Sequence, residues 1–215
     1  MDIKICGLST IETTDAVIAA GATHVGFIFF EKSPRHVTPL LAAELAARAK
    51  AKHVKSVAVT VDADDAYLDE IVTIMKPDIL QLHGHETPQR VAEVKAKYDL
   101  PVMKAFSISS AYDLTKTDAY LGVADRFLFD AKAPKGSDLP GGNGVSFDWS
   151  CLSKIDPSVD YMLSGGLNPA NVSDAMRRLN PPGLDMSSGV ESAPGKKDLN
   201  LIAAFFEAVR KAKSE

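Results

Sequence analysis

The chain has 215 residues, of which 46% are hydrophobic and 24% charged, and its formal net charge is −4. These globular proportions exclude disorder, collagen-like repetition and a disulfide-rich miniprotein. The mildly acidic balance, without any block of like charge, argues against a basic face for nucleic acid, so no nucleic-acid partner is expected.

The two cysteines, Cys6 and Cys151, show no paired spacing with another Cys or a His, so neither a disulfide framework nor a metal site is predicted. The amino-terminal residues lack a charged region followed by a long apolar segment, and the apolar run at 25–30 is too short to span a bilayer. We therefore expect reduced thiols, no membrane partner and a cytoplasmic location. The length suffices for one large core, so residues 1–215 are predicted to form a single catalytic domain.

Short apolar or β-branched runs alternate with longer stretches of helical spacing along the whole chain. The predicted strands cover residues 3–6, 24–29, 54–61, 79–82, 102–106, 126–129, 161–163 and 184–186. The predicted helices cover residues 10–20, 39–51, 65–75, 88–98, 111–121, 171–179 and 200–212, with a weak helical stretch near 148–155. Strands that are apolar almost throughout and separated by helices indicate a parallel sheet covered on both faces.

Eight such units of about 27 residues each favour a compact, single-domain α/β fold, the (β/α)8 or TIM barrel. A doubly wound open sheet is the alternative. Its first strand should lead into a Gly-rich dinucleotide loop, and Cys6-Gly7-Leu8-Ser9 is not such a loop. In a barrel, functional residues are expected just after each strand.

The loops after the last two predicted strands have the composition of a phosphate site. Gly165-Gly166 allows a close approach of backbone amides, and Ser187-Ser188-Gly189 adds N–H and hydroxyl donors. A lone Gly-Gly is more often a tight turn, but two donor-rich loops at adjacent barrel positions favour phosphate, aided by the amino end of a short extra helix. The expected partner is a small phosphorylated molecule.

Two reactive side chains end strands on opposite sides of the predicted barrel mouth. Asp130 follows the apolar run Phe127-Leu128-Phe129, an environment that favours a protonated carboxyl and hence a general acid. Cys6 ends the first strand, where a nearby cation or helix terminus would bring its thiolate within reach. Taken singly, Asp130 is equally well a loop cap and Cys6 an inert buried thiol. Together they suit a paired acid and base.

Three further features have less specific patterns. Arg35 follows Ser33-Pro34 and is suited to gripping a carboxylate, although an exposed surface arginine is the simpler interpretation. His83 fits a satisfied core residue, a ligand-stacking ring or a proton carrier equally well. The stretch Gly141-Gly142-Asn143-Gly144 is typical of a loop that closes over a site, or of a plain connector.

The sequence resembles the phosphoribosylanthranilate isomerase family. The resemblance covers nearly the whole chain, in order, through the segments Lys4-Ile5-Cys6-Gly7, Gly26-Phe27-Ile28-Phe29, Ser33-Pro34-Arg35, Gln81-Leu82-His83-Gly84, Phe129-Asp130, Phe147-Asp148-Trp149, Gly165 to Val172 and Ser187-Ser188-Gly189-Val190-Glu191. Each segment alone is weak to moderate, but the ordered set is highly specific.

This resemblance implies an isomerase of tryptophan biosynthesis that carries out the Amadori rearrangement of N-(5′-phosphoribosyl)anthranilate to 1-(2-carboxyphenylamino)-1-deoxyribulose 5-phosphate, without cofactor or metal. It implies that Asp130 is the general acid that opens the ribose ring and Cys6 the general base that removes the C2′ proton. Arg35 would hold the anthranilate carboxylate. The expected substrate-binding residues are Arg35, His83, Gly142, Gly144, Gly165, Gly166, Asp185, Ser187, Ser188 and Gly189. Either a monomer or a homodimer is compatible with the sequence.

Other phosphate-binding barrels are the competing interpretations. The aminoimidazole-carboxamide ribonucleotide isomerase of histidine biosynthesis has the pattern of a two-fold repeat, with paired aspartates and two phosphate sites. In this sequence the first strand carries Cys6, and one phosphate site is evident. A ribulose-phosphate epimerase needs metal ligands, which His83 and His85 do not supply convincingly. A catalytically silent barrel that binds a phosphorylated metabolite and regulates a partner need not keep both Cys6 and Asp130.

Overall fold

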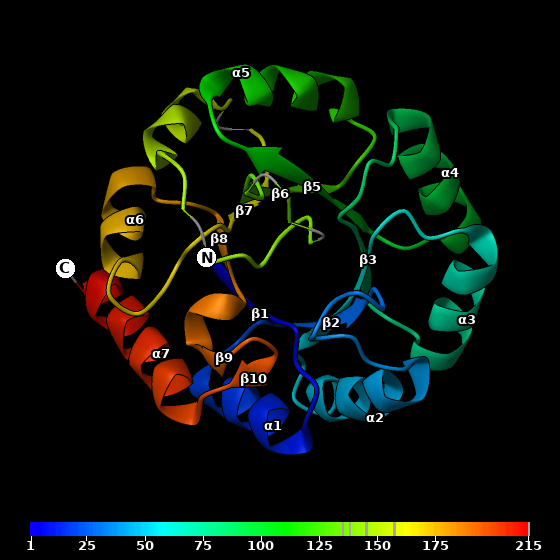
Figure 1. Cartoon of the computed structure of the whole chain (residues 1–215), viewed down its shortest axis with the longest axis horizontal. Coiled ribbons are helices and arrows are strands. Elements are labelled where there is room, and N and C mark those ends of the chain that lie inside the picture. The colour runs from blue at the N-terminus through cyan, green and yellow to red at the C-terminus, as the bar shows by residue number, and fades with distance from the viewer. Residues whose placement is uncertain (135, 138, 145, 157, 215) are drawn as a thin grey trace.

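Eight parallel strands close into a barrel in chain order, and the helices form a ring around them (Figure 1). The computed structural model describes residues 1–134, 136–137, 139–144, 146–156 and 158–214. The barrel strands are β1 (Asp2–Cys6), β2 (His24–Phe29), β3 (Lys55–Thr60), β4 (Ile79–Leu82), β5 (Val102–Ile108), β6 (Arg126–Ala131), β7 (Tyr161–Leu163) and β8 (Gly183–Met186). Because β1 also pairs with β8, with Lys4 opposite Asp185, the sheet has no free edge. The predicted TIM barrel is confirmed.

The outer ring consists of short helices that begin at sequence-encoded caps. The helices are α1 (Ile11–Ala20), α2 (Pro39–Lys50), α3 (Asp65–Met75), α4 (Pro88–Tyr98), α5 (Ala111–Leu114), α6 (Val172–Leu179) and α7 (Leu199–Ser214). Thr38, Asp64 and Thr87 each accept a hydrogen bond from the backbone N–H three residues later, which satisfies one of the free donors of the first turn. In the described ranges no helix is long and apolar enough to cross a membrane.

Two stretches expected to be α-helical are mostly 3-10 helix. The helix expected at 111–121 stops after α5, and Thr115–Tyr120 forms the 3-10 helix η1. The hydroxyls of Thr115 and Thr117 donate to the carbonyls of Tyr112 and Leu114, and such local bonds compete with α-helical pairing. The weak stretch near 148–155 forms the 3-10 helix η2 (Trp149–Lys154).

The segment after β8 contains structure that the periodicity did not predict. A single 3-10 turn, η3 (Ser188–Val190), follows the barrel strand. The antiparallel pair β9 (Glu191–Ala193) and β10 (Lys196–Lys197) comes next, and Figure 1 shows this hairpin as the last structure before α7. Strands of two or three residues are too short to leave a periodic signal in the sequence.

Alternating residues of each strand supply two separate apolar layers. Ile3 and Ile5 of β1 face the helices and belong to the large outer core, whereas Cys6 belongs to an inner cluster. The inner cluster contains Cys6, Val57, Val59, Ile79, Met103, Ala105, Leu128 and Met162. This packing fills the barrel interior, so a ligand has to bind above it, at the carboxyl ends of the strands.

His24, at the start of β2, makes folding stability sensitive to pH. Burial lowers its pKa from the usual 6.5 to about 4, helped by Arg126, Lys55 and Lys4 and opposed by Asp2. Below pH 6.5 the unfolded chain therefore binds a proton that the folded chain does not bind until about pH 4, so stability is full above pH 6.5 and falls as the pH drops to about 4. The loss amounts to at most about 3 kcal/mol.

We expect His24→Gln to remove this contribution to acid sensitivity. The measurement is the change in the free energy of urea unfolding between about pH 7.5 and about pH 4.5, a range that covers most of the interval between the two pKa values. The matched control is His85→Gln, because the His85 side chain is 94% exposed. Equal acid sensitivity in the wild type and the His24 variant would contradict the prediction.

Candidate active site

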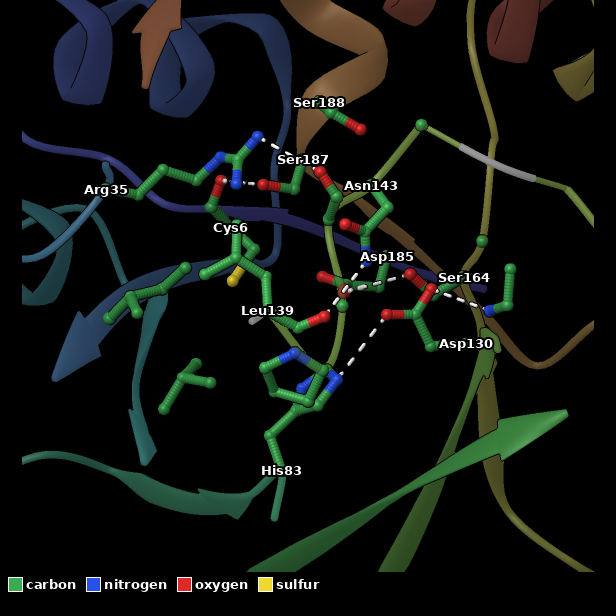
Figure 2. Close-up of a pocket in the computed structure, with 18 of the residues that line it drawn as sticks. Cys6, Arg35, His83, Asp130, Leu139, Asn143, Ser164, Asp185, Ser187 and Ser188 are labelled. Carbon is green, nitrogen blue, oxygen red and sulfur yellow. Dashed lines mark hydrogen bonds and ion pairs between the residues drawn. The ribbon is translucent and has the colours of Figure 1, made fainter. Parts of the chain in front are cut away.

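One pocket of about 760 Å3, counting its open mouth, contains every site residue expected from the sequence. Its lining includes Cys6, Arg35, His83, Asp130, Gly142, Gly144, Gly165, Gly166, Asp185, Ser187, Ser188 and Gly189. Figure 2 shows Cys6 and Asp130 approaching the pocket from different strands. A concave pocket in which a few polar side chains converge is the usual form of a small-molecule site.

Cys6 is the last residue of β1, and its position is fixed from two sides. Its backbone carbonyl accepts a hydrogen bond from Ser187 Oγ at 3.1 Å, which ties the end of β1 to the loop after β8. The following residue, Gly7, has φ +75°, and a Cβ there would lie 2.6 Å from Arg35 Cδ, so this turn requires glycine. Burial raises the pKa of the Cys6 thiol, and the charge of Lys4 opposes that effect.

Asp130 stands in β6 with its carboxyl at the pocket wall. Its Oδ1 accepts a hydrogen bond from the backbone N–H of Ala131 at 2.8 Å, and its Oδ2 lies 3.4 Å from His83 Nε2 (Figure 2). Gln81 orients the imidazole, because its Nε2 lies 2.9 Å from His83 Nδ1. A Cβ on Gly141 would collide with both Asp130 Oδ2 and His83 Nε2, so the loop after β6 covers this pair closely.

Arg35 is buried and forms an ion pair with Glu191. Its Nε and Nη2 donate to the two carboxylate oxygens of Glu191 at 2.7 and 2.8 Å, and Nη2 also lies 3.3 Å from the carbonyl of Gly142. Lys197 Nζ donates to Glu191 Oε1 at 2.7 Å. Burial alone would raise the pKa of Glu191, but Arg35 and Lys197 hold it below its usual range. The Nε and Nη2 groups, which could bind a substrate carboxylate in a bidentate manner, are thus occupied by Glu191. The Nη1 group of Arg35 takes no part in the pairing with Glu191.

The first of the two expected phosphate loops adopts a conformation that requires glycine. Gly165 and Gly166 have φ +84° and +68°, and added Cβ atoms would lie 2.5 Å from Ala131 N and 2.7 Å from Ser146 N, respectively. Asn171 Nδ2 donates to the carbonyl of Gly166 at 2.9 Å, which fixes the peptide. The expected short extra helix is the three-residue turn η3 rather than an α-helix.

Several residues of this region were not singled out from the sequence. Ser164 lines the pocket, and its Oγ lies 3.4 Å from Asp185 Oδ2. Glu191 and Lys4 pair with predicted site residues. The sequence did contain a signal for the role of Lys4: it is a charged residue between Ile3 and Ile5, on the face of β1 that also carries Cys6. Within the described residues, no group of three or more His, Cys, Asp or Glu is arranged to hold a metal ion.

The sequence matches the family described as N-(5′-phosphoribosyl)anthranilate isomerase over residues 3–208. A curated relative from Mesorhizobium japonicum, an N-(5′-phosphoribosyl)anthranilate isomerase, is 63% identical over 215 residues, which covers 100% of this chain and 98% of the relative.

Solved structures agree with the sequence matches. A dimeric phosphoribosylanthranilate isomerase from Thermotoga maritima, crystallised as monomers, is 30% identical with a TM-score of 0.84, over 98% of this chain and 99% of that one. A phosphoribosylanthranilate isomerase in complex with reduced 1-(o-carboxyphenylamino)-1-deoxyribulose 5-phosphate gives the same TM-score of 0.84 at 30% identity, with the same coverage of 98% and 99%.

Proposed function

Because this chain belongs to the N-(5′-phosphoribosyl)anthranilate isomerase family and isomerises phosphoribosylanthranilate in tryptophan biosynthesis, we propose that Asp130 and Cys6 are the acid and base of that reaction. The observation that carries the proposal is their convergence on one pocket from β6 and β1, beside two glycine loops suited to a phosphate. An acid and a base that face one substrate are sufficient for an Amadori rearrangement.

The reaction begins with ring opening by Asp130. Its carboxyl gives a proton to the ribose ring oxygen, the C1′–O bond breaks, and the nitrogen lone pair forms an iminium with C1′. The hydrogen bond from Ala131 N–H and the neighbouring His83 hold the carboxyl in one orientation for this transfer. The carboxylate that remains is stabilised by the same two groups.

Cys6 acts in the second step. Its thiolate removes the C2′ proton, whose acidity is raised by the adjacent iminium, and the C–H electron pair forms the C1′=C2′ bond while the nitrogen becomes neutral. The resulting enolamine gains a proton at C1′ and loses one from the 2′-hydroxyl to give the amino ketone. Because burial raises the pKa of Cys6, the rate of this step should increase with pH.

The two ends of the substrate carry negative charge, and the pocket offers a site for each. We assign the anthranilate carboxylate to Arg35, through the Nη1 edge that the Glu191 contact leaves unused. We assign the phosphate to the loops of Gly165, Gly166, Ser187, Ser188 and Gly189. His83 and Asp185 line the space between for the sugar, and Gly142 and Gly144 belong to the loop that covers it.

We also propose a cytoplasmic location, which suits an enzyme of amino-acid biosynthesis, and a monomer or homodimer as the assembly. The Thermotoga maritima relative is dimeric and was crystallised as monomers, which supports leaving both states in the proposal.

The experiment that tests the roles measures conversion of phosphoribosylanthranilate generated in situ, and binding of the reduced product analogue, for the wild type and for variants at Cys6 and Asp130. Loss of conversion with intact binding supports the proposal. A variant at either position that converts substrate like the wild type overturns the role of that residue.

Gly166→Ala tests the phosphate assignment. The added methyl group would meet Ser146 N and Cβ, both at 2.7 Å, in a left-handed backbone conformation, so the loop has to move away from the phosphate position. We expect KM to rise by about 10-fold or more with a smaller change in kcat, because phosphate binding contributes equally to the ground and transition states.

The matched control is Gly122→Ala. Gly122 has φ +74°, but nothing lies within 4 Å of its added Cβ, so this variant introduces the same backbone strain away from the pocket. Equal KM values for the two variants would contradict the phosphate assignment.

A further inference from the structure

Lys4 is a buried cation paired with Asp185, which lines the pocket, and nothing in the reaction described above uses it. It lies on β1 two residues before Cys6, so both side chains point to the barrel interior. The Lys4 side chain has no exposed surface, and its Nζ donates to Asp185 Oδ1 of the neighbouring strand β8 at 2.7 Å. A buried lysine is rare unless it is paired, and here the pair borders the site.

The ammonium of Lys4 shares one small space with the Cys6 sulfur. The opposite residue on β2 is Gly26, which pairs with Cys6 in the strand register. A Cβ placed on Gly26 would lie 2.9 Å from Cys6 Sγ and 3.1 Å from Lys4 Nζ. Sulfur and nitrogen are therefore separated by at most about 6 Å, the range in which an opposite charge strongly favours an ionised group.

The charges that face Cys6 are few. Burial raises the pKa of its thiol; the charge and hydrogen bond of Lys4 act against this, as does Lys197 more weakly, whereas Asp185 adds to it. β2 contributes Gly26 and Ile28 to this space, and its titratable residue His24, opposite Lys4, is uncharged at neutral pH because burial lowers its pKa to about 4. Although burial disfavours its charged form, Lys4 keeps a pKa above its usual value because of Asp185 and Cys6. It remains a cation throughout the neutral pH range.

We propose that Lys4 is a positioning residue for the isomerisation: Asp185 holds its ammonium against Cys6, where it stabilises the thiolate that takes the C2′ proton. The proposal rests on the proposed role of Cys6 as the base. When the thiolate accepts the proton it becomes neutral, and Lys4 keeps a full counter-charge in Asp185, so the buried ammonium is paired at both stages.

The decisive variant is Lys4→Met, which keeps the length of the side chain and removes its charge. We expect the thiolate absorbance of Cys6 to titrate at least about 1 pH unit higher than in the wild type, measured in a Cys151→Ala background so that one thiol contributes. kcat at neutral pH should fall by about 10-fold or more and recover as the pH rises, since more thiolate then forms without the lysine. KM should change less than kcat.

Two further variants separate this role from a structural one. Lys104→Met removes another buried lysine, which pairs with Glu86 at 3.0 Å under the loop after β4, and it should leave the Cys6 titration unchanged. The double variant Lys4→Met/Asp185→Asn leaves no unpaired charge in the barrel if the single variant fails to fold. Its Cys6 titration should also move upward, because Lys4 affects the thiol more strongly than Asp185 does.

An unshifted titration in both Lys4 variants overturns the proposal and leaves the role of Cys6 untouched. The proposal is also overturned if Lys104→Met shifts the titration as much as Lys4→Met does. If Cys6→Ala retains full conversion, the proposed base is wrong, and with it the use of Lys4 in the reaction, whatever the titration shows.

Discussion

Asp130→Asn should lower kcat for phosphoribosylanthranilate by about 10²- to 10⁴-fold, the usual contribution of a positioned general acid. Asparagine has nearly the same shape as aspartate, and its carbonyl can still accept the hydrogen bond that Ala131 N–H donates to Oδ1 at 2.8 Å. It has no proton to give at neutral pH, so ring opening loses its acid. Steady-state kinetics with substrate generated in situ measures the loss, and binding of the reduced product analogue should change little.

Asp78→Asn is the matched control for this variant. Asp78 also accepts a backbone hydrogen bond, from Ser56 N–H at 2.7 Å, but it precedes β4 at the opposite end of the barrel. Its activity should match the wild type. If Asp130→Asn keeps kcat within about 3-fold of the wild type, Asp130 is not the general acid.

Cys6→Ala should reduce kcat by about 10²-fold or more, because no other thiol lines the described pocket. Cys6→Ser should be nearly as inactive, since a hydroxyl loses its proton far less readily than a thiol. Because burial raises the pKa of Cys6, the wild-type kcat should rise with pH through the neutral range, and this dependence should disappear in both variants.

Cys151→Ala is the control for the loss of a thiol. Cys151 is the other free cysteine; it lies in η2 and packs against the outer core. Its removal should leave the pH dependence of kcat as in the wild type. A Cys6→Ala variant that keeps both wild-type activity and its pH dependence would show that another group removes the C2′ proton.

The elements that the sequence predicted well are those with a strong local pattern. The strands His24–Phe29, Ile79–Leu82 and Tyr161–Leu163 and the helices Asp65–Met75 and Pro88–Tyr98 have the predicted bounds. Their apolar spacing follows from backbone geometry within a single element, so neighbouring residues suffice to reveal it. The prediction of an α-helix over the second half of 111–121 was wrong, because threonine hydroxyls favour the tighter 3-10 turn there.

The candidate site was predictable because a barrel brings the ends of its strands to one rim. Once eight β–α units were recognised, residues following different strands had to converge, and all the expected site residues line one pocket. The family resemblance supplied the chemistry that spacing alone left open for Cys6, Asp130 and Arg35.

The partners of these residues were decided only by the tertiary structure. Arg35 meets Glu191, which is 156 positions away, and Lys4 meets Asp185, which is 181 positions away. In the sequence Arg35 fits either a carboxylate clamp or an exposed surface arginine, and Lys4 is a charged residue within an apolar strand. The sequence by itself determined the eight barrel strands, most of the helices around them and the residues at the barrel rim, because these follow from local periodicity and from the order of the strands. The pairing of these charges was decided only by the tertiary structure. The barrel closes when β1 pairs with β8, and this closure brings residues near the start of the chain within hydrogen-bonding distance of residues near its end.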